Sequence, residues 1–87
     1  MFRVEAKRRA LRALERFTLE RKNRVKEVIS TLKGDPIPFR RLDVAKLRGY
    51  ENTYRIRVGD LRIVYEVNWD KKRILIHFIG SRERAYE

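Results

Sequence analysis

Residues 52–68 read NTYRIRVGDLRIVYEVN, and this stretch decides the fold. Its two halves alternate between apolar and polar residues, and they meet at Gly59-Asp60. A two-residue loop that begins with glycine between two such runs predicts a β-hairpin with a type II′ turn. Because the turn sets the register, the expected cross-strand pairs are Val58 with Leu61, Arg57 with Arg62, Ile56 with Ile63, Arg55 with Val64 and Tyr54 with Tyr65.

The alternation gives this hairpin one apolar face and one basic face, because successive side chains of a strand point to opposite sides. The basic face carries Arg55, Arg57 and Arg62. Like charges directly opposite one another destabilise a strand pair. A sequence that sets Arg57 against Arg62, beside Arg55, therefore indicates a surface that binds an anion. The apolar face should carry Tyr54, Ile56, Val58, Leu61, Ile63 and Tyr65.

The length and the net charge of the chain limit the number of domains and the kinds of binding partner that we expect. A chain of 87 residues predicts one domain, residues 1–87, with a single core. Lys and Arg number 23 against 12 Asp and Glu, and the resulting net charge of +11 is spread along the chain. This pattern favours binding to RNA, DNA or an acidic protein. The alternative is a solvated, thermophile-like surface, although such surfaces usually balance their signs.

The chain has no cysteine and a single histidine, His77. Disulfides, thiol nucleophiles and zinc–thiolate sites are thereby excluded, and we expect neither a metal nor another cofactor. No apolar run reaches the length of a membrane span, and residues 1–5 lack the apolar core of a signal peptide. We therefore expect a cytoplasmic protein with no membrane contact.

Before the hairpin, the sequence predicts a short strand and two helices. Apolar residues alternate over residues 2–6, and from Lys7 they recur at helical spacing as far as Phe17. A second helix should follow with Thr18 as its N-cap and stop at Gly34. We expect these two helices to pack together as a helical hairpin.

In residues 35–51 the apolar residues follow neither the alternation of a strand nor the spacing of a helix. Pro36 and Pro38 argue against a regular strand ladder, so we expect an ordered segment that crosses the core. The apolar run at residues 73–79 predicts an interior strand covered on much of both faces. The predicted fold is α+β: a short N-terminal strand, a helical hairpin, then an antiparallel sheet of three or more strands with the helices packed on one face.

Three stretches, in this order, resemble the RelE/ParE superfamily of toxins from toxin–antitoxin pairs, and in particular its archaeal RelE-type members. They are KLRG at residues 46–49, YRIRVGDLRIVYEV at residues 54–67 and IGSRE at residues 79–83, followed by an aromatic residue near the terminus, Tyr86. The resemblance runs nearly end to end, and it implies a RelE-like fold.

The resemblance also implies an activity. RelE-type toxins are endoribonucleases that enter the ribosomal A site and cut messenger RNA there, with a 2′-hydroxyl attacking the adjacent phosphate. They are held by an acidic RelB-like antitoxin in a hetero-oligomer. Matched position by position, the expected catalytic residues are Arg55, Arg57, Arg62, Arg82 and Tyr86. We expect RNA-phosphate contacts from Lys46, Arg48 and Arg84.

Fixed guanidinium groups suit the negative charge that gathers on a phosphate during cleavage. They do not supply a base, because arginine stays protonated at any working pH, and some relatives have lysines where this chain has Arg55 and Arg57. Glu66, expected opposite Thr53 on the arginine side, and Tyr86 are candidates for the base. Positioning by the ribosome could replace one. His77 is interpreted as structural.

Two other functions fit the same sequence. One is a ParE-like toxin that inhibits DNA gyrase by protein contact and does not cut RNA. The other is an RNA-binding protein without catalysis on the same scaffold.

Overall fold

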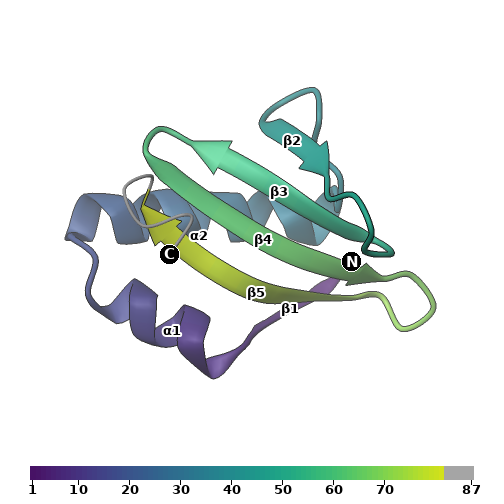
Figure 1. Ribbon diagram of the computed structural model, residues 1–87, viewed down its shortest axis with the longest axis horizontal. Helices are drawn as coiled ribbons and strands as arrows, with labels where there is room; N and C mark the ends of the chain where they lie inside the picture. The colour runs from purple at the N-terminus through teal and green to yellow at the C-terminus, as the bar shows by residue number, and fades with distance from the viewer. Residues whose placement is uncertain (82–87) are drawn as a thin grey trace.

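The structure, a computed structural model, describes residues 1–81. Five strands form one sheet in the order β1-β5-β4-β3-β2, with two helices beside it (Figure 1). This architecture confirms the predicted α+β fold. The elements are β1 (Arg3–Ala6), α1 (Arg8–Glu15), α2 (Leu19–Gly34), β2 (Asp43–Lys46), β3 (Thr53–Val58), β4 (Leu61–Asn68) and β5 (Arg73–Ser81).

The hairpin of β3 and β4 has the predicted register in all five pairs, from Val58 opposite Leu61 to Tyr54 opposite Tyr65. Gly59 has a φ of +58°, as a type II′ turn requires at its first central position. Two arginines of α2 reach this turn: Arg21 forms an ion pair with Asp60, and the guanidinium of Arg24 lies against Gly59. The turn is therefore attached to the helix as well as to its own strands.

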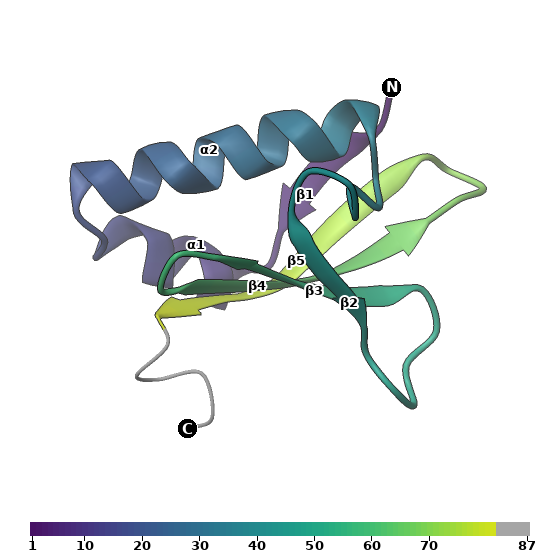
Figure 2. The same cartoon turned by 90° about the horizontal axis from the view of Figure 1, so that it is seen from above.

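Helix α2 covers one face of the sheet, and no helix of residues 1–81 covers the other (Figure 2). Its N-cap is Thr18 as predicted, because the Thr18 hydroxyl accepts a hydrogen bond from the backbone N–H of Arg21 at 3.3 Å. The expected apolar face of the hairpin lies under the helix. The buried core comprises Ala10, Val25, Val28, Leu32, Ile56, Leu61, Ile63, Tyr65, Val67, Ile74, Ile76 and Ile79.

Helix α1 lies along the outer edge of β5, beyond the point where β1 ends. The backbone N–H of Lys7 donates to the carbonyl of Ile76 at 2.9 Å, and Arg9 Nε donates to the carbonyl of His77 at 3.1 Å. The helical hairpin is thus asymmetric: one helix covers a sheet face and the other covers a strand edge.

Strand β1 pairs with β5 in parallel, so the sheet is mixed. The two helices carry the chain from β1 to β2, the strand at the opposite edge of the sheet, and β3, β4 and β5 then return antiparallel to one another until β5 lies beside β1. Strand β5 lies between β1 and β4, which confirms its predicted interior position. None of the helices in residues 1–81 is long and apolar enough to cross a membrane.

The expectation that residues 35–51 contain no regular ladder was wrong for Asp43–Lys46. These residues form β2, an edge strand that pairs antiparallel with β3 and sets Val44 opposite Ile56. Pro36 and Pro38 lie several residues before β2, and proline excludes a ladder only near its own position.

We expect Gly59→Ala to lower the free energy of unfolding by roughly 1–2 kcal/mol, because a side chain is disfavoured at positive φ. A methyl group there would also meet the guanidinium of Arg24. Urea unfolding measures the effect. Gly34→Ala is the control, since Gly34 ends α2 with open space around it and the substitution should be neutral or slightly stabilising. Equal effects of the two substitutions would contradict this account of the turn.

Tyr65 is fully buried, and its hydroxyl donates to the carbonyl of Pro36 at 2.7 Å. Burial raises the pKa of the Tyr65 hydroxyl well above its ordinary value of 10.0, and nearby Tyr54 and Asp35 raise it further. A raised pKa means that the un-ionised hydroxyl contributes stability below about pH 10 and loses that contribution as the pH rises further.

We therefore expect Tyr65→Phe to be less stable than the unsubstituted chain by about 1 kcal/mol at pH 7, and this difference should shrink above about pH 10. Urea unfolding of both proteins between pH 7 and 11 measures it. Taking the difference removes the titration of all other groups. A difference that stays constant up to pH 11 would rule out the assigned pKa shift.

Candidate functional site

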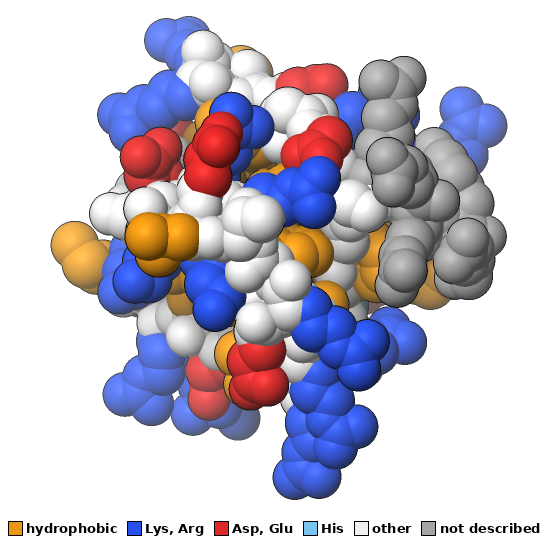
Figure 3. Space-filling model, turned by 90° about the vertical axis from the view of Figure 1, so that its left-hand side faces the viewer, with side chains coloured by type: hydrophobic (Ala, Val, Ile, Leu, Met, Phe, Trp, Pro, Cys, Tyr) orange, Lys and Arg blue, Asp and Glu red, His pale blue; other side chains and the backbone are white. Residues whose placement is uncertain are grey.

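The arginine cluster lies on the sheet face opposite α2. Arg55 and Arg57 are on β3, Arg62 is on β4, and Arg57 and Arg62 are direct cross-strand partners. This grouping is the one that the hairpin register predicted. Figure 3 shows Lys and Arg side chains over much of one side of the molecule, with smaller groups of Asp and Glu between them, in keeping with the net charge of +11.

The three arginines have different surroundings. Arg57 is exposed and Arg62 is partly buried. The Arg55 side chain is only 15 % exposed, and its Nη1 lies 3.6 Å from Asp43 Oδ1. Asp43 was missed in the sequence because it is on β2, which was not foreseen. Its carboxylate partly neutralises Arg55, which lowers the positive charge of the face around β3.

Lys46 and Arg48 border this face at the end of β2 and in the following turn, and both are exposed. Lys46 Nζ donates to the carbonyl of Tyr50 at 3.0 Å, so it also holds the loop that leads into β3. Three residues of the expected site, Arg82, Arg84 and Tyr86, lie outside the described residues.

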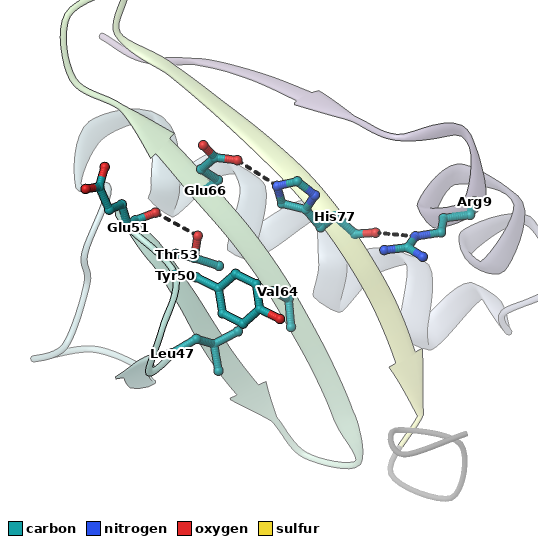
Figure 4. Close-up of a pocket in the computed structure, with 8 residues that line it drawn as sticks. All are labelled: Arg9, Leu47, Tyr50, Glu51, Thr53, Val64, Glu66 and His77. Carbon is teal, nitrogen blue, oxygen red and sulfur yellow. Dashed lines mark hydrogen bonds and ion pairs between the residues drawn. The ribbon is translucent and has the colours of Figure 1, made fainter.

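A cavity of about 450 Å³ opens on the same face, further along β4. Glu66 of β4 and His77 of β5 lie side by side in its lining and point toward one another (Figure 4), with His77 Nε2 2.8 Å from Glu66 Oε1. Because a carboxylate only accepts hydrogen bonds, Nε2 donates this one. The cavity is lined by Arg9, Leu47, Tyr50, Glu51, Thr53, Val64, Glu66 and His77.

A β-bulge brings His77 into this cavity. Val64 pairs with Phe78 while the next residue, Tyr65, pairs with Ile76, so His77 is the extra residue of β5. Glu66 lies opposite Thr53 on the arginine side, as expected. Its bond to His77 could not be read from the sequence. The sequence signal for the bulge is the spacing of the isoleucines, which is two residues from Ile74 to Ile76 and three from Ile76 to Ile79 and so departs from strict alternation.

The chain matches the model of a family described as the ParE toxin of type II toxin-antitoxin systems, parDE, over residues 4–86. It is 40 % identical over 86 residues to "Putative toxin RelE1" of Methanocaldococcus jannaschii, which covers 99 % of this chain and 96 % of that protein. The chain belongs to the RelE/ParE superfamily of toxins. The resemblance found in the sequence is thus confirmed, and the chain is a RelE-type toxin of a toxin–antitoxin system.

Solved structures of this superfamily have a similar fold. A chain of the archaeal RelE–RelB complex from Pyrococcus horikoshii OT3 matches with a TM-score of 0.85 at 35 % identity, covering 97 % of this chain and 98 % of that one. A chain of the intact E. coli RelBE toxin–antitoxin complex matches with a TM-score of 0.81 at 22 % identity, covering 97 % and 100 %. The second similarity supports the RelE fold alone.

We expect Asp43→Asn to strengthen the binding of a single-stranded RNA oligonucleotide by roughly twofold to fivefold, the range expected when a partly exposed ion pair is broken. The substitution releases Arg55 on the basic face. Fluorescence anisotropy at fixed salt measures the affinity. Glu27→Gln, on the exposed side of α2, makes the same change in net charge away from that face. If both substitutions strengthened binding equally, only net charge would matter and Arg55 would have no special part.

Proposed function

We propose that this RelE-type toxin is a ribosome-dependent endoribonuclease that cuts messenger RNA in the ribosomal A site and so inhibits translation. The observation that carries the proposal is the position of Arg57 and Arg62, directly opposite one another on the open face of the sheet and beside Arg55. Guanidinium groups that the register places side by side can bind the same phosphate through charge-assisted hydrogen bonds.

The proposed reaction is attack of a ribose 2′-hydroxyl on the adjacent phosphate, with departure of the 5′-oxygen of the next nucleotide and formation of a 2′,3′-cyclic phosphate. Negative charge increases on the phosphate oxygens as the bond to the 2′-oxygen forms. Directly opposed residues have Cβ atoms about 4.5–5.5 Å apart, so the guanidinium groups of Arg57 and Arg62 can reach the same phosphate. Their fixed charge would stabilise the transition state.

Arg55 extends this charge on β3, while Lys46 and Arg48 would position the RNA strand through its phosphates. Arg82 and Tyr86 complete the proposed catalytic set, and Arg84 the proposed RNA contacts.

The acceptor of the 2′-hydroxyl proton must be another group, since arginine does not lose its proton. Glu66 is four residues from Arg62 along β4, which is roughly 13 Å of extended strand. A general base must lie within hydrogen-bonding reach of the proton that it takes. We therefore do not assign this role to Glu66, which leaves Tyr86 and positioning by the ribosome as the remaining candidates.

The proposed partners are the ribosome, its messenger and an acidic RelB-like antitoxin, all in the cytoplasm. The net charge of +11 would speed association with an acidic protein. Similarity to RelE–RelB complexes from two archaea supports a hetero-oligomer of toxin and antitoxin.

We expect the protein to produce codon-phased cuts in a messenger that is being translated. Primer extension on RNA from a translating extract maps the cuts. Arg62→Ala should slow cleavage by roughly 10²-fold or more, because it removes one group that stabilises the transition state. Lys26→Ala, on the exposed surface of α2, removes one positive charge from the far side of the molecule and should leave cleavage unchanged. An acidic protein encoded beside this toxin should stop the cuts.

Three outcomes would reject the proposal. Intact messenger together with blocked DNA supercoiling would indicate a gyrase inhibitor. Tight, salt-sensitive RNA binding with no cuts would indicate a binding protein without catalysis. Equal cleavage by Arg62→Ala and Lys26→Ala would show that the arginine face is not the site.

A further inference from the structure

The cavity on the open face differs in chemistry from the arginine cluster beside it. Two of its lining residues, Glu51 and Glu66, carry carboxylates, and only Arg9 brings a guanidinium group. Carboxylates repel phosphate. An RNA strand with its phosphates at Arg57 and Arg62 would therefore place an uncharged part of a nucleotide in the cavity, and the planar base is the part that specific RNA recognition reads.

The walls suit a base. Leu47, Val64 and the ring of Tyr50 are the apolar lining (Figure 4). Tyr50 is 65 % exposed, which is high for an aromatic residue with a cavity beside it. Exposed aromatic rings at RNA-binding surfaces stack on unpaired bases. The volume of about 450 Å³ lies within the roughly 300–1,000 Å³ typical of small-ligand sites.

The carboxylate of Glu66 supplies hydrogen-bond acceptors in the lining of the cavity. His77 Nε2 holds Glu66 Oε1 at 2.8 Å, and the carboxylate keeps further acceptor positions for a ligand. Guanine carries two adjacent donors on its Watson–Crick edge, N1–H and the N2 amino group, which match the two oxygens of a carboxylate. Adenine and cytosine offer one amino donor on that edge, and uracil offers one N–H.

We propose that this cavity binds a guanine base of single-stranded RNA, with Glu66 on its Watson–Crick edge and Tyr50 stacked on its face. The inference rests on the proposed function in one respect, that the guanine belongs to the messenger being cut. His77 acts as a positioning residue, since the bulge in β5 directs its ring at Glu66. Because Glu66 lies roughly 13 Å along β4 from Arg62, the guanine lies within a codon's length of the phosphate that is cut.

The first test needs neither ribosomes nor cleavage. Isotope-labelled protein is titrated with the 5′-monophosphates of guanosine, adenosine, cytidine and uridine, which carry the same phosphate, and amide resonances are followed by NMR. We expect the guanosine nucleotide to shift Thr53, Val64 and His77, with an affinity roughly tenfold above that of the other three.

Two substitutions separate the hydrogen bonds to the edge of the base from the stacking on its face. Glu66→Gln replaces one acceptor oxygen by a donor and should remove the preference for guanosine. Tyr50→Ala should weaken all four nucleotides, because stacking does not depend on the base. Glu27→Gln is the matched control and should change nothing. Equal affinities for the four nucleotides would overturn the inference, and so would shifts confined to Arg57 and Arg62 or a guanosine preference that survives Glu66→Gln.

The translating extract separates this inference from the proposed function. With both correct, Glu66→Gln should redistribute cuts away from codons that carry guanine at one fixed position. If no cuts occur but guanosine monophosphate still binds at Glu66, the proposed function fails, the link to a cut messenger fails with it, and the guanine site stands. Cuts whose codon distribution is unchanged by Glu66→Gln, with unselective nucleotide binding, would reject the guanine site alone.

Discussion

The structure depends on the register of the β3–β4 hairpin. A slip of one residue would exchange the faces of the strand that slips; if β3 slipped, Ile56 would face water while Arg55 and Arg57 would face the core. Gly59 permits the tight turn, and α2 attaches to that turn through the ion pair of Arg21 with Asp60. The same helix buries the apolar side of the hairpin. One constraint therefore sets both the core and the charged surface.

The open face has two chemically distinct ends. Toward the hairpin turn, Arg57 and Arg62 concentrate positive charge; further along β4, the pair of Glu66 and His77 presents fixed acceptors beside the ring of Tyr50. A polyanion with bases attached to it needs both kinds of surface. Under the proposed function, phosphates would bind to the first surface and an uncharged base would fit the second. The RelE-type fold supplies the sheet, and the side chains of this chain make one end of its open face basic and place hydrogen-bond acceptors at the other end.

Several features could be predicted because they depend on neighbours in the chain. The two-residue turn at Gly59-Asp60 fixed every pair of the hairpin, and Thr18 caps α2 through a contact three residues away. The edge strand β2, the parallel pairing of β1 with β5 and the bulge at His77 escaped prediction. Each involves a partner strand distant in sequence, and β2 was further obscured by the prolines that precede it.

By itself, the sequence determined the local structure, the two faces of the hairpin and the arginines of the candidate site, because alternation and turn chemistry act within a few residues. Its motifs also indicated the superfamily. Only the tertiary structure decided which charges are compensated and which groups meet. Asp43 reaches Arg55 through β2, and His77 reaches Glu66 through a bulge between β4 and β5. Such contacts depend on how separate strands are placed beside one another, and no spacing in the chain records that placement.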